Sequence, residues 1–288
     1  MLEPAVTPSR VCWNGLSFHL DPGCEVTIKN DSHLIIEHQL SPLAEIRWSI
    51  TGKKKRNKNF QSLDRDLSAK YERLKISDIS RFQTISSNFE LASYRTNHGE
   101  HRELVLALQC KSCGTNYLLH CADSQEQSKP IVTLYEQLSC THPGTVRNQV
   151  WQIQDFYFLV PQTFSLSSQR FSPGNSILTF TNGPTILYYG RIVPTLAGSH
   201  QEDYATLFCS LTGLRQDQLV EEKSTFSGLN TPSLTSRIAT LLHRRKIFQW
   251  GHAQIFEDHD RFLVVSLQSR KRIDTDLQNR LSNGYGLI

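Results

Sequence analysis

Two segments of this chain carry the same pattern of apolar residues and prolines. This internal repeat predicts a fold made of two similar modules. The first segment opens at Trp13 and the second at Trp151, and each continues with alternating apolar and polar residues. A proline follows, Pro22 in the first segment and Pro161 in the second, and another apolar segment comes after it. Alternation of this kind is typical of β-strands, so each half is expected to begin with strands.

Further strand signals follow each opening, with turn-forming residues between them. In the first half they lie at 34–38, 44–48, 104–110 and 116–121, and in the second half at 176–180, 185–189, 247–255 and 261–267. The last two segments of each half are close enough in the chain to form a hairpin.

A helix is expected between the two groups of strands in each half. Residues 63–74 place Leu63, Leu67, Tyr71 and Leu74 on one stripe at helical spacing. The second half offers 202–211 and 233–243 at this place. A closing helix is expected at 130–140 in the first half and at 274–281 in the second.

The common order of strands, helix, strands and helix predicts an α+β fold. We expect two tandem, diverged copies of one module, each an antiparallel sheet flanked by helices. The first module is expected at residues 9–142 and the second at 150–288. The boundary falls in a polar stretch that contains Pro143 and Gly144.

The opening of each copy resembles the start of domains with the Mog1/PsbP-like fold. The residues that carry this resemblance are Trp13, Phe18 and Pro22 in the first copy and Trp151, Phe158 and Pro161 in the second. The resemblance implies a sheet between helices and an accessory or binding role. It implies no functional residue.

The clearest chemical signal is a pair of cysteines two residues apart, Cys110 and Cys113, followed by Gly114. A tight turn of this kind presents two thiolates to one ion, as in zinc ribbons, and glycine relieves the backbone after the second ligand. A tetrahedral site needs two more ligands, and Cys140 and His142 are the first candidates. His120 and Cys121, across the predicted hairpin, are the alternatives. The sequence thus predicts zinc in the first copy, and the second copy has no equivalent cysteines.

A thiol-redox enzyme is the competing hypothesis for the same two cysteines. Such dithiols are reactive where the first cysteine lies at a helix N-terminus. Here the pair follows one predicted strand and precedes another, and the motif lacks that context.

A compact basic run is a candidate for binding nucleic acid or another anionic surface. It consists of Lys53, Lys54, Lys55, Arg56 and Lys58. The formal net charge of +4 is small for 288 residues and does not require such a partner. The alternative is a solvated loop.

The sequence lacks the motifs that are typical of several common enzyme classes. No phosphate-binding glycine loop, zinc-protease motif or nucleophile elbow is present. No apolar run is long enough to span a membrane, and the first ten residues do not resemble a secretory signal. Seven cysteines, an odd number, favour reduced thiols in the cytoplasm. We expect a non-enzymatic interaction or accessory protein whose partner is another protein or a second copy.

Overall fold

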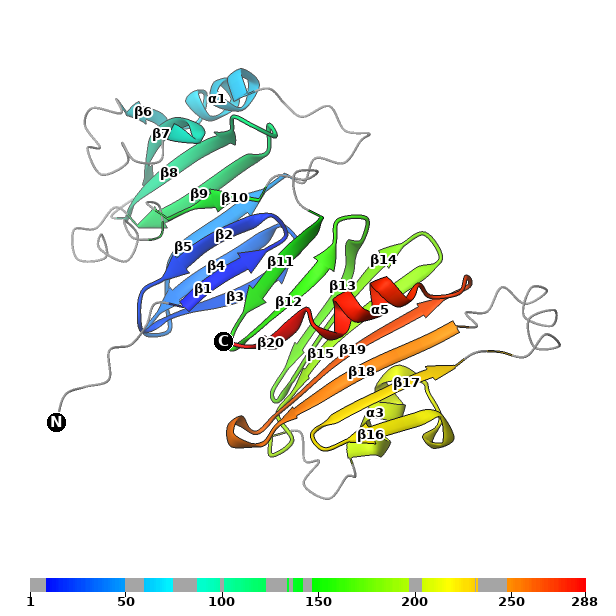
Figure 1. Ribbon diagram of the computed structural model, residues 1–288. Helices are drawn as coiled ribbons and strands as arrows, with labels where there is room; N and C mark the ends of the chain where they lie inside the picture. Colours follow the sequence, from blue (N-terminus) through cyan, green and yellow to red (C-terminus); the bar gives the residue numbers. More distant parts are fainter. Residues whose placement is uncertain are drawn as a thin grey trace. The chain divides into compact units, whose positions relative to one another are not determined.

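The chain forms two compact units, Met1–Gln154 and Asp155–Ile288 (Figure 1). The computed structural model describes residues 9–49, 60–74, 87–98, 101–122, 134, 137–141, 147–196, 204–230, 232 and 248–288. Within these residues the fold is mostly β, and the neighbouring strands described below pair in antiparallel orientation. No helix among them is both long enough and apolar enough to cross a membrane.

The first unit is built on a seven-stranded sheet. One of its central strands carries the uninterrupted apolar run Leu104–Leu108, which is expected where a sheet is covered on both faces. In spatial order the strands are β3 (Cys24–Asn30), β4 (His33–His38), β5 (Ser41–Trp48), β9 (Asn116–Ala122), β8 (His101–Cys110), β7 (Phe89–His98) and β6 (Glu72–Leu74).

One face of this sheet is covered by helix α1 (Phe60–Ser68). Phe60 and Leu67 of the helix pack with Tyr94, Val105 and Ala107 of the sheet. The predicted helix at 63–74 is therefore confirmed in kind, but it begins and ends earlier. Its stripe residues Leu63 and Tyr71 join the same cluster, whereas Leu74 lies in β6.

A second layer of the first unit contains four strands. Their spatial order is β10 (Ser139–Cys140), β2 (Leu16–Leu20), β1 (Ser9–Trp13) and β11 (Asn148–Ile153). The pairing of β1 with β11 brings the two repeated tryptophans, Trp13 and Trp151, into edge-to-face contact at 4.8 Å. The Trp13 indole also donates to the carbonyl of Asn30, at the end of β3 (3.3 Å).

The second unit has its own seven-stranded sheet. In spatial order the strands are β13 (Ser165–Ser172), β14 (Asn175–Asn182), β15 (Thr185–Ile192), β19 (Arg261–Ser269), β18 (Phe248–Phe256), β17 (Thr225–Asn230) and β16 (Leu219–Glu222). Both predicted hairpins, β8–β9 and β18–β19, are confirmed by their pairing.

Helix α3 (Tyr204–Thr212) covers one face of the second sheet through Phe208, which packs with Phe226 and Phe262. On the other face, Phe158 of β12 (Phe156–Pro161) stacks on Tyr189 at 4.4 Å. β12 pairs with β20 (Tyr285–Leu287), which follows helix α5 (Thr275–Ser282). The helices predicted at 202–211 and 274–281 are thus confirmed, whereas 233–243 lies outside the described residues.

The closing helix predicted at 130–140 is wrong at its C-terminal end. Ser139 and Cys140 form strand β10, because their backbones pair with Ser17 and Leu16 of β2. Tertiary pairing overrides local helix propensity here. Leu134 and Leu138 are buried, as the apolar pattern suggested.

Helix α3 lies so close to the sheet that residue 251 must be glycine. A Cβ atom on Gly251 would lie 2.7 Å from Thr212 Cγ2 and 2.9 Å from Phe208 Cζ, closer than van der Waals contact allows. We predict that Gly251→Ala lowers the free energy of unfolding of the second unit by about 1–3 kcal/mol, since the helix must move outward. Urea unfolding followed by circular dichroism measures this.

The control for this prediction is Leu196→Ala in the same unit. Leu196 is 68% exposed, so its truncation should change the free energy of unfolding by less than about 0.5 kcal/mol. Equal stability of Gly251→Ala and wild type would contradict the close approach of α3.

Candidate metal centre

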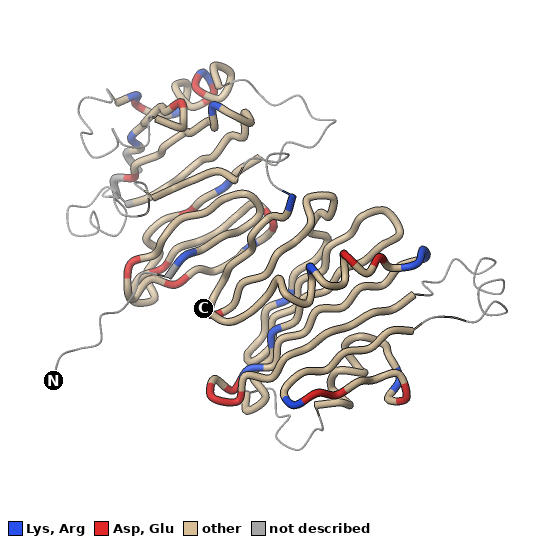
Figure 2. The backbone as a smooth tube through the Cα atoms, in the orientation of Figure 1, with Lys and Arg blue, Asp and Glu red and all other residues tan. Residues whose placement is uncertain are grey.

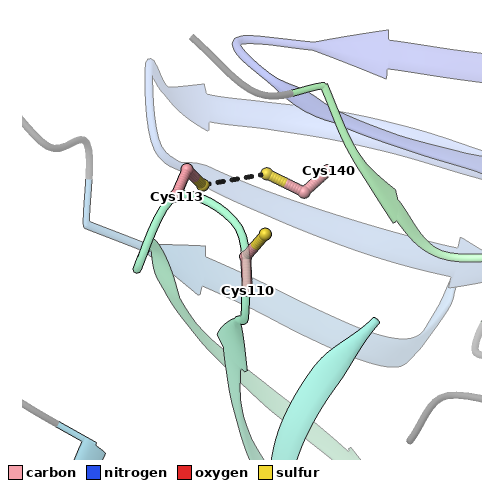
Figure 3. A group of neighbouring side chains, drawn as sticks. All are labelled: Cys110, Cys113 and Cys140. Carbon is pink, nitrogen blue, oxygen red and sulfur yellow. Dashed lines mark hydrogen bonds between the residues drawn. The ribbon is translucent and has the colours of Figure 1, made fainter. Parts of the chain in front are cut away.

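Three cysteines converge in the first unit. Cys110 ends β8, Cys113 lies in the turn between β8 and β9, and Cys140 ends β10. Their sulfur atoms all lie within 4.8 Å of one another, and those of Cys113 and Cys140 are 3.4 Å apart (Figure 3). Three of the four predicted ligands are therefore brought together.

The turn between β8 and β9 is built to present two sulfurs on one side. The N–H of Cys110 donates to the Thr115 carbonyl (2.9 Å), and the N–H of Gly114 donates to the Cys110 carbonyl (2.8 Å). Gly114 adopts a φ of 72°, which is the left-handed region that glycine enters without a steric penalty. This is the role that the sequence assigned to it.

Cys140 reaches the site from another layer of the unit. Strand β10 pairs with β2, and the N–H of Thr141 then donates to the Gly15 carbonyl (2.8 Å). The hydroxyls of Ser17 and Ser139 are hydrogen-bonded at 2.6 Å. The three sulfurs therefore meet where the β8–β9 turn of the seven-stranded sheet approaches strand β10 of the second layer.

The site is sheltered from solvent. Cys110 is 1% exposed, whereas Cys113 and Cys140 are half-buried. Burial raises the pKa of the Cys140 thiol well above its ordinary value, and the neighbouring sulfurs of Cys113 and Cys110 raise it further. Without a cation, Cys140 therefore stays protonated at neutral pH.

Tyr117 supports the site from β9. Its hydroxyl donates a hydrogen bond to the sulfur of Cys140 (3.0 Å), and its ring is buried. Burial, with the nearby cysteines, raises the pKa of Tyr117, so the phenol stays a donor. Cys113 is hydrogen-bonded to the Thr115 hydroxyl (3.2 Å). Sequence reasoning missed both partners, because a tyrosine or threonine in a strand carries no metal-site signal.

The sulfur geometry fits a metal ion. Zinc–sulfur bonds of about 2.3 Å in a tetrahedron place thiolates about 3.8 Å apart. The sulfur atoms of Cys113 and Cys140 are 3.4 Å apart, and all three sulfurs lie within 4.8 Å of one another. Soft thiolate ligands select zinc or Cu(I) over magnesium or calcium. Cys110, Cys113 and Cys140 can therefore hold a soft metal ion once their protons are displaced.

The geometry gives no support to thiol-redox catalysis. All seven cysteines lie in the described part of the chain, and none forms a disulfide. Cys110 and Cys113 occupy a turn between strands instead of a helix N-terminus.

The remaining predicted ligands either lie apart from the cluster or fall outside the part of the chain that the structure describes. Cys121 is buried in β9 and donates to the Leu104 carbonyl (3.6 Å), and burial lowers the pKa of His120. Neither belongs to the three-cysteine group. His142 and the basic run of Lys53, Lys54, Lys55, Arg56 and Lys58 lie outside the described residues.

Comparisons with known proteins identify no family. No family model and no curated protein matches the chain. Two solved structures are similar at 9% identity. One is a Tle4–Tli4 complex, with a TM-score of 0.30 over 95% of this chain and 90% of the other. The other is MucB in complex with MucA(peri), with a TM-score of 0.21 over 94% of this chain and 82% of the other. These scores are too low to support an inference, and the Mog1/PsbP resemblance stays a prediction.

Removal of the Tyr117 hydroxyl should weaken metal binding. Tyr117→Phe keeps the ring but loses the hydrogen bond to the Cys140 thiolate, and loss of such a supporting bond lowers metal affinity about 10-fold to 100-fold. Competition between the protein and a chromophoric chelator for Zn²⁺ measures the affinity.

The matched control is Tyr94→Phe. Tyr94 is a buried tyrosine of the same unit whose hydroxyl forms a hydrogen bond with Asp64 in helix α1. This variant should keep wild-type affinity. If both variants bind Zn²⁺ as wild type does, Tyr117 plays no part in the site.

Proposed function

We propose that this chain is a non-enzymatic accessory protein that binds other protein chains, and that zinc bound by its cysteine cluster stabilises the first unit. The observation that carries the metal proposal is the convergence of Cys110, Cys113 and Cys140 from two separate layers. Zinc has no redox chemistry and is bound by cysteines in closed structural sites. An ion at this place holds the β8–β9 turn against β10.

The fourth zinc ligand in this proposal is His142. It stands two residues after Cys140 in the sequence, and imidazole is a common partner of three thiolates in structural zinc sites. This assignment stays a sequence prediction, and a variant tests it below.

The chain is also proposed to consist of two diverged copies of one module, at residues 9–142 and 150–288. The support is the strand order of the two seven-stranded sheets. Counting along the chain, β3-β4-β5-β9-β8-β7-β6 and β13-β14-β15-β19-β18-β17-β16 follow the same sequence of neighbours. Helices α1 and α3 precede β6 and β16 respectively.

Metal content tests the proposal directly. Protein purified without added metal or an affinity histidine tag should contain about one zinc per chain, measured by elemental analysis of reduced samples. Cys110→Ser with Cys113→Ser should remove the metal, since serine is not a zinc ligand at neutral pH. His142→Ala should lower zinc affinity if His142 supplies the fourth ligand.

Cys12→Ser and Cys209→Ser are the matched controls. Both cysteines lie outside the cluster, so these variants should retain zinc. Reduced wild-type protein that neither contains zinc nor binds added zinc would overturn the metal proposal.

The β16–β17 hairpin is proposed as a protein-binding surface. Leu219 and Gly228 are paired and face the α3 side, so Val220 and Leu229 face the other way. Val220 is 55% and Leu229 46% exposed. Leu229 is paired with the buried Trp250, so an apolar surface continues from the core to the outermost strand of the sheet.

The proposed occupant of this surface is a second copy of the chain. Sedimentation of wild-type protein should show association that rises with concentration. Val220→Lys with Leu229→Lys should stay monomeric, because charged side chains cannot be buried there without partners. Leu196→Lys, another exposed leucine of the unit, is the control and should associate as wild type does. A wild-type monomer at every concentration would refute self-association.

Nucleic-acid binding is the second candidate, and it rests on the basic run at Lys53–Lys58 alone. In the described part of the chain, lysines and arginines are spread over both units (Figure 2). A cytoplasmic location is part of the proposal, because an odd number of cysteines favours reduced thiols.

A further inference from the structure

The two units close in the same way. In the first unit β10 pairs with β2, and the N–H of Thr141, just after β10, donates to the carbonyl of Gly15, just before β2 (2.8 Å). In the second unit β20 pairs with β12, and the N–H of Ile288, just after β20, donates to the carbonyl of Asp155, just before β12 (3.0 Å). We name each arrangement the closing corner of its unit.

Each closing corner is tied to a hairpin turn of its seven-stranded sheet by different chemistry. In the first unit the tie is the contact of Cys140 with Cys110 and Cys113 at the β8–β9 turn. In the second unit the corresponding β18–β19 turn contains no cysteine. There the tie runs from Asp155 to Arg261, the first residue of β19.

The Asp155 tie is a closed network of charges. One carboxylate oxygen accepts from Arg191 Nε (2.5 Å), and the other accepts from Arg191 Nη2 (2.7 Å) and Arg261 Nε (2.6 Å). Arg261 Nη1 also donates to the carbonyls of His259 (2.8 Å) and Asp260 (3.0 Å) in the turn. Burial alone would raise the pKa of Asp155, but the two guanidinium groups hold it below its ordinary value.

We propose that the Asp155–Arg191–Arg261 network holds in the second unit the same corner that a metal ion holds in the first, so that metal controls the closing corner of the first unit alone. This inference rests on the proposed zinc site. We call the pairing of β10 with β2 the joint of the first unit, and in this proposal it is stable only while the metal is bound. The corresponding pairing of β20 with β12 in the second unit does not depend on metal.

The two ties differ in whether they need a bound metal ion. Arginine is charged at every relevant pH, and bidentate arginine–carboxylate pairs are strong and well oriented. The Asp155 network is therefore present whenever the second unit is folded. Three thiols without a metal offer only weak hydrogen bonds, and as thiolates they repel one another. The cysteine tie therefore needs a cation.

The first corner also has less backbone pairing to rely on. β10 contributes two paired residues, Ser139 and Cys140, whereas β20 contributes three. Loss of the metal should therefore release β10 from β2 by local opening, without unfolding the seven-stranded sheet.

Hydrogen exchange of the full chain, followed by mass spectrometry, tests the joint. Reduced protein is compared with one equivalent of Zn²⁺ and with excess chelator. Chelation should speed exchange in peptides covering residues 139–141 by roughly tenfold or more, since local opening exposes those amides. Peptides covering 285–288 should exchange at the same rate in both states.

Asp155→Asn gives the reciprocal result. The neutral amide cannot bind both guanidinium groups as a carboxylate does, so exchange at 285–288 should rise with zinc present or absent, while 139–141 still responds to zinc. Arg191→Gln keeps the Arg261–Asp155 contact and serves if Asp155→Asn fails to fold. It should give a smaller rise at 285–288.

The outcomes separate the two proposals. Zinc that binds stoichiometrically but leaves exchange at 139–141 unchanged overturns the joint and leaves the zinc site standing. Zinc removal that speeds exchange equally at 139–141 and 285–288 also overturns it, because the second corner should not respond. Failure to bind zinc overturns the proposed function and this inference together.

Discussion

Burial of both faces of each seven-stranded sheet is the constraint on which the rest of the structure depends. In β8 the side chains from Val105 to Leu108 are fully buried, and β19 is buried in the same way from Phe262 to Leu267. Neighbouring residues of a strand point to opposite faces, so each sheet needs a cover on both sides. Helices α1 and α3 supply one cover. The other is supplied by strands β1, β2, β10 and β11 in the first unit and by β12 and β20 in the second.

The weak point of this arrangement is the place where the second cover ends. β10 and β20 are among the shortest strands of the described chain, and short strands add little pairing energy of their own. We propose that a cross-link to the sheet compensates for this in each unit. It is zinc bound by the cysteine cluster in the first unit and the Asp155 network in the second, and each lies beside a hairpin turn of the seven-stranded sheet.

Much of the fold followed from local patterns, because they record burial directly. The alternation around Trp13 and Trp151, the apolar runs of β8 and β19 and the stripe of Leu63, Leu67 and Tyr71 all report which side chains face a core. Strands β6, β7, β16 and β17 were not predicted, because each is short or has polar residues among its apolar ones and therefore carries a weak apolar pattern. β10 was misassigned to a helix, since two residues are too few for any periodicity.

The sequence by itself determined the central strands, the packing helices and the two cysteines of the turn, because residues close in the chain set these features. Only the tertiary structure decided that Cys140 meets Cys110 and Cys113, that Tyr117 donates to that sulfur and that Asp155 binds two arginines. These contacts join residues far apart in the chain. Their proximity comes from the pairing of β10 with β2 and from the stacking of one layer on another, which no local pattern encodes.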